Sequence, residues 1–268
     1  MLKGMSALRI AVMAALVTLL LGAQNKGILL EDLTWVEAEK VLTPDTIVVI
    51  PVGAESKEHG PHLKLKNDWL IAEYLKREVL RRRNVVIAPT VNYHYYPAFV
   101  EYPGSTTLRI ETARDLMVDI VHSLARYGPQ RFYALNTGVS TMRALRLSAE
   151  VLATDGIQFR FTDILKVAED TEKKVKQEEG GTHADEIETT MMLFIAPATV
   201  DMKKALKDYH PGKGGGLSRD PNGKADYSAS GIFGDATLAT RKKGEIMVNA
   251  IVEGILREID DLRGSAVR

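Results

Sequence analysis

The chain has 268 residues, 45% of them hydrophobic and 26% charged, which is the composition of an ordinary globular protein. Its 35 basic and 35 acidic residues give a formal net charge of zero. Nucleic-acid-binding proteins gather a basic excess on one face, so we expect no nucleic-acid partner. The chain contains no cysteine, which excludes disulfides, thiolate catalysis and iron–sulfur clusters.

Residues 1–23 have the pattern of a secretory signal peptide. Lys3 and Arg9 give a basic start without an acidic residue, and an apolar run follows from Ile10 to Leu21. A basic start, about a dozen apolar residues and a small-residue end are typical of a cleavable signal. The run is shorter than the roughly twenty residues of a membrane-spanning helix, and an uncleaved anchor is the alternative. We expect a secreted or periplasmic mature chain that begins near residue 24, forms one domain over 24–268 and meets the membrane only during export.

Short apolar runs alternate with longer amphipathic segments along the mature chain. Strands are predicted at 46–50, 85–88, 131–135 and 159–162. Helices are predicted at 31–42, 68–83, 110–127, 141–155, 185–195 and 244–262. Strands that alternate with helices form mostly parallel sheets covered by helices on both faces. The sequence therefore predicts an α/β fold of three layers around a mostly parallel central sheet.

The segment after the first of these strands concentrates carboxylates and imidazoles. Within fourteen positions it contains Glu55, Glu58, His59, His62 and Asp68. Ligands of open α/β sheets bind beyond the carboxyl ends of the strands, and such side chains suit zinc or manganese. A solvated polar loop is the alternative, but a Gly-Pro pair restricts the segment and leucines alternate with its lysines. The pattern therefore favours a metal site.

The same segment resembles the metal-binding segment of the creatininase (creatinine amidohydrolase) family. The resemblance rests on PVGA, then EHGPHL, then Asp68 nine residues after His59. Members of that family usually have Glu-x-His-Gly here, whereas this chain has one extra residue between Gly53 and His59. His59 and Asp68 match the family residue by residue, and the ligand glutamate is either Glu58 or Glu55.

Further stretches extend the resemblance over nearly all of the mature chain. The segment THADEIETT is similar to the family's H-A-G-E-x-E-T-S, which implies a catalytic role for His183 and a metal-site carboxylate at Glu188. YPGST at 102–106, GIFGD at 231–235 and ATRKKGE at 239–245 are similar to other family segments.

One position departs from the family pattern. Gly138 stands where the family has a histidine that ligates one of two metals, and glycine offers no side-chain ligand. Either the site holds one metal ion, or another residue supplies the ligand, with His94 the first candidate and His62 the second. Asn136 and Ser140, at the same strand end, are expected to contact the substrate. So is Tyr95, in an aromatic loop that either walls the pocket or simply packs.

The resemblance implies a metal-dependent amidohydrolase that cleaves the C–N bond of a small, often cyclic, amide. One or two ions of zinc, manganese or iron would activate a water molecule, and His183 would carry a proton to the leaving nitrogen. Family resemblance also implies a homo-oligomer, a hexamer. Two alternatives stay open: a secreted binding protein without activity, and a single-metal enzyme that acts on an ester or lactone.

Overall fold

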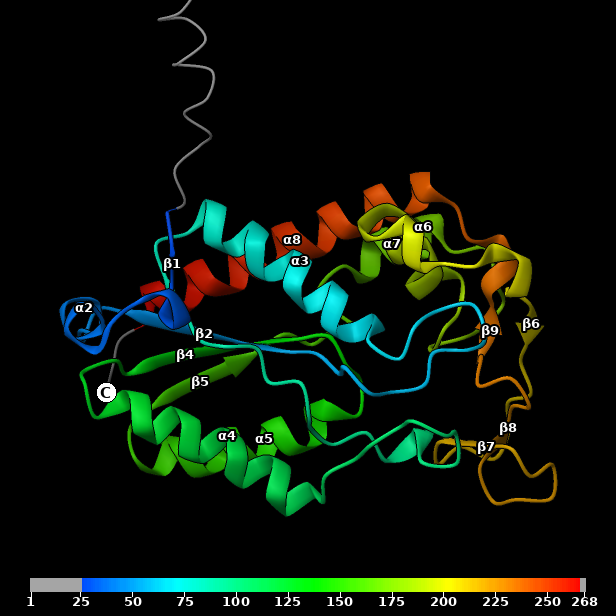
Figure 1. Cartoon of the computed structure of the whole chain (residues 1–268), viewed down its shortest axis with the longest axis horizontal. Helices are drawn as coiled ribbons and strands as arrows, with labels where there is room; N and C mark the ends of the chain where they lie inside the picture. Colours follow the sequence, from blue (N-terminus) through cyan, green and yellow to red (C-terminus); the bar gives the residue numbers. More distant parts are fainter. Residues whose placement is uncertain (1–25, 266–268) are drawn as a thin grey trace, which may run out of the picture.

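The computed structural model describes residues 26–265, and its centre is a five-stranded parallel sheet (Figure 1). The strands are β1 (Ile28–Leu29), β2 (Ile47–Val52), β3 (Val86–Ile87), β4 (Arg131–Asn136) and β5 (Gln158–Phe161), in the order β1-β3-β2-β4-β5. Strands β2 and β4 pair along their full length, with Ile47 opposite Arg131 and Val52 opposite Asn136. The predicted parallel sheet is therefore confirmed, and both central strands end at the same edge.

Alternation of side chains along β2 divides the core into two layers. Every residue of β2 is buried, because helices cover both faces of the sheet. Ile47 and Val49 pack in one hydrophobic cluster and Val48 and Ile50 in the other, as the two-residue period of a strand requires.

Helices lie in two layers on either side of the sheet, as Figure 1 shows. One layer contains α3 (Asn67–Arg82), α6 (Glu169–Val175), α7 (Glu186–Ile195) and α8 (Arg241–Gly264). The other contains α4 (Ile110–Ala125) and α5 (Thr141–Thr154), with α2 (Trp35–Val41) near the start of the chain. The three-layer prediction is confirmed.

Local signals explain where two of the helices begin. Thr34 caps α2 through a capping box with Glu37, each satisfying a backbone N–H of the other. Helix α3 begins at Asn67 with Lys66 as its N-cap, so Asp68 lies in the first turn, where the helix dipole favours a carboxylate. Gly53 allows this turn to approach β2, because a Cβ there would lie 2.5 Å from the Asp68 carbonyl oxygen.

The segment between α7 and α8 contains short elements that no hydrophobic period predicts. They are the 3-10 turns Pro197–Thr199, Met202–Lys204 and Ala236–Leu238, the antiparallel pair β6 (Lys207–Asp208) and β9 (Gly234–Asp235), and the parallel pair β7 (Leu217–Ser218) and β8 (Asp226–Tyr227). Two further 3-10 turns lie at Leu30–Asp32 and Pro97–Phe99.

The predicted signal peptide, 1–23, lies outside the described residues. Among residues 26–265, no helix combines the length and the apolar character needed to cross a bilayer.

Candidate active site and metal centre

A cavity of about 310 Å³ opens at the carboxyl ends of β2 and β4. Its walls come from the loop after β2, the turn after β4, the 97–99 turn and the segment leading into α7. This is the edge where parallel α/β sheets bind ligands. The charged or titratable side chains that line the cavity are Lys57, Arg143, Glu172, His183, Asp185, Glu188 and Asp226.

His59 is fully buried behind the cavity wall and fixed at both ring nitrogens. Nδ1 lies 2.9 Å from the Lys57 carbonyl oxygen, and Nε2 lies 2.8 Å from Asp68 Oδ1. A carbonyl only accepts, so Nδ1 carries a proton and donates it to that bond. Nε2 is left either to share a proton with Asp68 or to offer its lone pair to a cation.

Asp68 forms a buried ion pair with Lys57. Lys57 Nζ lies 2.7 Å from Asp68 Oδ2, and both side chains are at most 5% exposed. Burial alone would raise the pKa of Asp68, but the charges of Lys57 and His59 outweigh it and lower that pKa. Burial likewise opposes the charged form of Lys57, yet Asp68 and Glu188 hold its pKa above the ordinary value. The pair is therefore ionised.

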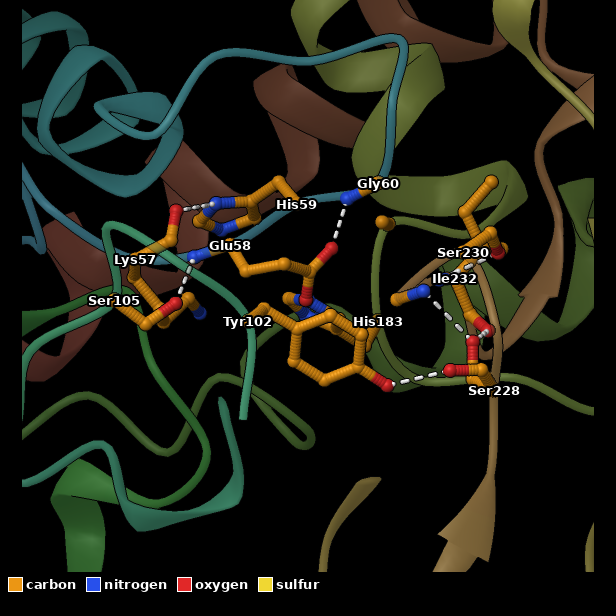
Figure 2. Close-up of polar contacts among 12 residues, drawn as sticks. Lys57, Glu58, His59, Gly60, Tyr102, Ser105, His183, Ser228, Ser230 and Ile232 are labelled. Carbon is orange, nitrogen blue, oxygen red and sulfur yellow. Dashed lines mark hydrogen bonds and ion pairs between the residues drawn. The ribbon is translucent and has the colours of Figure 1, made fainter. Parts of the chain in front are cut away.

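Glu58 contacts the Nε2 side of the His183 ring (Figure 2). Its Oε2 lies 3.0 Å from His183 Nε2, and its Oε1 accepts the Gly60 N–H. Burial would raise the pKa of Glu58, but His183 and the Gly60 N–H reverse the shift and lower it. The carboxylate fits only because residue 231 is glycine, at φ +86°, where a Cβ would lie 2.0 Å from Glu58 Oε1.

The segment before α7 brings His183 and Glu188 together. Ala184, between them in the chain, has a left-handed φ of +48°, a conformation that costs an alanine about 1–2 kcal/mol. This turn lets the Ala184 N–H donate to the Glu188 carboxylate, and His183 Nδ1 lies 3.5 Å from Glu188 Oε2. The His183 ring also packs against Phe99, with ring centroids 4.2 Å apart.

Asp185 is the N-cap of α7 and accepts the Glu188 N–H at 2.9 Å. Burial, and then the nearby Glu178 and Glu188 carboxylates, raise its pKa well above the ordinary value.

Among residues 26–265, His59, His183 and Glu188 form a group that could hold a metal ion. Each offers one ligand atom, and these atoms lie within 4.8 Å of one another. Two imidazoles and one carboxylate are a donor set that zinc accepts, with a further position open for water. The residues present therefore fit one metal ion.

Three other predicted ligands have partners of their own. Glu55 is exposed and accepts from Asn92 Nδ2, whereas Glu58 supports His183. His62 is buried with Nε2 2.7 Å from Thr189 Oγ1, and burial, only partly offset by Glu188, lowers its pKa to about 4.

His94, the first candidate to replace the missing histidine, is fully buried away from the charged groups. Burial alone lowers its pKa to about 4, and neither ring nitrogen has a partner among the described residues. His94 does not line the cavity, and neither does Tyr95, which is half-buried beside it.

The turn after β4 is held by Asn136 rather than left open for a ligand. Its amide donates to the carbonyls of Gly138 and Thr162, and its oxygen accepts from the Gly138 N–H and Thr141 Oγ1. All of these groups are buried, so Asn136 shapes the wall, while Ser140 lines the cavity. A Cβ at Gly138 would lie 3.0 Å from Thr141 Oγ1, which leaves little room for a larger residue.

Lys57 is the site residue that sequence reasoning missed. It stands two positions before His59, where the family motif Glu-x-His-Gly has its glutamate. The sequence signal that could have identified Lys57 is this position, two residues before His59. The search for a glutamate drew attention to Glu58 and Glu55 instead.

The fold and the site together define the class of this protein. It is an α/β protein whose parallel sheet has a charged, histidine-containing cavity at its carboxyl edge, where a metal ion could bind. The chain belongs to the creatininase family: the family model described as creatinine amidohydrolase matches residues 31–259.

Known relatives agree with that assignment. A creatinine amidohydrolase of Pseudomonas putida is 26% identical over 250 residues, which are 86% of this chain and 95% of the relative. A mycofactocin precursor peptide peptidase of Mycobacterium tuberculosis (strain CDC 1551 / Oshkosh) is 25% identical over 227 residues, 79% of this chain and 84% of the relative.

Solved structures share the fold. One described as "Creatininase Mn" superposes with a TM-score of 0.76 at 24% identity, covering 89% of this chain and all of the other. A putative creatinine amidohydrolase from Bacteroides fragilis has a TM-score of 0.70 at 20% identity and covers 91% of this chain and 99% of the other. The names of two creatininase structures mention metals, one manganese and one a Zn-Zn type.

Proposed function

We propose that this chain is a metal-dependent amidohydrolase that cleaves the C–N bond of a small amide in the cavity at the carboxyl edge of the sheet. The observation that carries the proposal is the convergence of His59, His183 and Glu188 at that edge, in a chain of the creatininase family. The names of the relatives, an amidohydrolase and a peptidase, support amide chemistry. At about 310 Å³ the cavity is at the small end of ligand pockets, which favours a small substrate.

A metal ion held by these three side chains would supply a water of lowered pKa and would polarise the amide carbonyl. The chain's own residues prepare that position. The Lys57 carbonyl fixes His59 with its proton on Nδ1, and Glu58 holds His183 at Nε2. Carboxylates and carbonyls that orient histidines in this way are common partners of metal-binding rings.

The role of His183 follows from its two nitrogens. With Nε2 facing Glu58, Nδ1 is the atom that faces Glu188 at 3.5 Å, an arrangement that suits a metal ligand. The sequence predicts a proton carrier instead. His183→Gln separates the two roles: loss of the metal together with activity identifies a ligand, whereas loss of activity with the metal retained identifies the proton carrier.

The function is tested with metal-stripped protein reloaded with zinc or manganese and offered linear amides, cyclic amides, short peptides, esters and lactones. We expect hydrolysis of an amide that depends on the metal and disappears in Glu188→Gln. Glu253→Gln, on the exposed side of α8, is the matched control and should keep full activity. Faster turnover of esters or lactones would favour the single-metal esterase alternative. A protein that binds metal and small amides without turnover would be the binding protein.

A further inference from the structure

The cavity already contains a buried positive charge from the chain itself. Lys57 is 4% exposed, yet its ammonium lines the cavity and lies 2.7 Å from Asp68. A buried lysine needs strong compensation, because its charged form is costly to remove from water. That compensation comes from the Asp68 carboxylate, which is buried against the ammonium.

Two aromatic rings also lie near the ammonium. Lys57 Nζ lies 4.7 Å from the centre of the Phe99 ring and 5.9 Å from that of Tyr96. Ring faces attract cations at these distances, so the aromatic rings and the Asp68 carboxylate both favour a positive charge at the position of Nζ. The pocket around Nζ is therefore built for a cation.

Asp68 has no oxygen left for a second metal ion, because one oxygen faces the His59 nitrogen of the proposed single site and the other faces the Lys57 ammonium. The two distances are 2.8 Å to His59 Nε2 and 2.7 Å to Lys57 Nζ. The turn after β4 offers no replacement, because Gly138 has no ligand and the Asn136 amide is occupied. A second divalent ion beside Asp68 would meet the ammonium at short range, and like charges at that range repel strongly.

We propose that the Lys57 ammonium is a resident cation of this site, in the place beside Asp68 that a second metal ion would need, so that the chain holds at most one divalent ion. This inference extends the proposed function and rests on it for the position of the single ion at His59, His183 and Glu188. The ammonium also lines the cavity, where it is placed to donate to a substrate carbonyl.

The test counts metal ions in purified, tag-free chain with no substrate present. Wild type, Lys57→Glu and Lys57→Met are stripped, titrated with Zn²⁺ or Mn²⁺ and measured by calorimetry and elemental analysis. We expect wild type to bind at most one ion and Lys57→Glu to bind a second. Lys57→Met should bind its ion at least tenfold more tightly than wild type does. Lys76→Met is the matched control: Lys76 is also buried and paired, 2.7 Å from Glu31, but it lies away from the cavity, so its count and affinity should equal those of wild type.

Two results would overturn the proposal: two tightly bound ions in wild type, or Lys57 variants that fold but match wild type in both count and affinity. If wild type binds no ion and Lys57→Glu binds one, the result supports the resident ammonium but contradicts the metal dependence of the proposed function. Failure of this inference and failure of the proposed function therefore give different results. If both variants fail to fold, a crystal of wild type soaked in Zn²⁺ decides. Lys57 Nζ still within hydrogen-bond reach of Asp68 Oδ2 supports the proposal, and an ion bonded to Oδ2 in place of the ammonium refutes it.

Discussion

At the residue scale, the site is a set of four carboxylates and two imidazoles whose partners define their roles. Asp68 pairs with Lys57 and His59, Glu58 supports His183, and Glu188 is the carboxylate that remains directed toward a potential ion. Asp185 is the fourth and serves as the helix cap. Type and spacing alone do not separate these roles, since each residue could be a ligand.

The first prediction separates a ligand from its support. Glu188→Gln should abolish metal binding, because it removes one of three donors. Glu58→Gln should keep a count of one ion with affinity lowered by about 10–100-fold, since it loosens the His183 ring without removing a donor. Calorimetric titration measures both. Loss of the ion in Glu58→Gln alone would support Glu58 as the ligand, one of the two glutamates that the sequence offers.

The second prediction concerns His94 and acid stability. Its pKa is about 4 when folded, against an ordinary value of 6.5. Between these values the unfolded chain takes up a proton that the folded chain does not, so stability is lost as pH falls from about 6.5 to 4 and is unaffected above that range. The loss is at most roughly 3 kcal/mol for this group. His62 acts in the same direction.

Replacing His94 tests this contribution. His94→Leu removes two buried nitrogens that have no partner among the described residues, so it should be neutral or stabilising near pH 7 and should flatten the decline in acid. Urea unfolding at pH 7, 6, 5 and 4 measures both effects. The metal count should not change. An unaltered pH slope would contradict the assignment.

At the element scale, the sequence predicts the fold well wherever one hydrophobic period persists. The runs that became β2 and β4 are continuous and apolar, and α4, α5 and α8 each present one apolar face, so their places follow from pattern alone. The two-residue strands β6 to β9 carry too short a pattern to detect. Strands β6 and β9 form through a long-range contact, the pairing of Lys207 with Asp235.

The candidate site divides in the same way. His59, His183 and Glu188 were predictable because the family motifs place them at strand and helix ends. Lys57 was missed because the extra residue in its loop hides its register, and only the folded loop shows which side chain meets Asp68. The occupied amide of Asn136 was equally out of reach, since one of its partners, Thr162, is distant in the chain.

The third prediction tests how the loop before β9 supports the site. Gly231→Ala should destabilise the protein and displace Glu58 from His183, because the new Cβ would overlap the Glu58 carboxylate at a left-handed φ. Gly156→Ala is the matched control, with φ +75° and open space around it, so it carries the backbone strain without the overlap. Metal affinity should fall in Gly231→Ala but not in Gly156→Ala. Equal affinities in the two variants would show that the position of Glu58 does not affect metal binding.

At the scale of the whole molecule, two expectations concern export and assembly. Export with cleavage near residue 24 is predicted from the first 23 residues, and assembly into a homo-oligomer is predicted from the family resemblance. N-terminal sequencing of the protein from its native host tests the first. A chain that keeps Met1 on soluble cytoplasmic protein would contradict it.

The last prediction concerns what metal removal does to the whole fold. The sheet and both helical layers are packed by apolar contacts that involve no ligand, so the stripped chain should remain folded. An ion that binds only the folded state at a hundred times its Kd adds about 2.7 kcal/mol. For a chain of this size that corresponds to a fall of about 5–10 °C in Tm when a chelator removes one ion. Calorimetric scans with and without chelator measure this shift, and Glu188→Gln, which lacks the ion, should show none. Unfolding of wild type on chelation would mean that the metal holds the layers together. A shift near twice that size would mean that two ions are bound, against the single position that Lys57 leaves open.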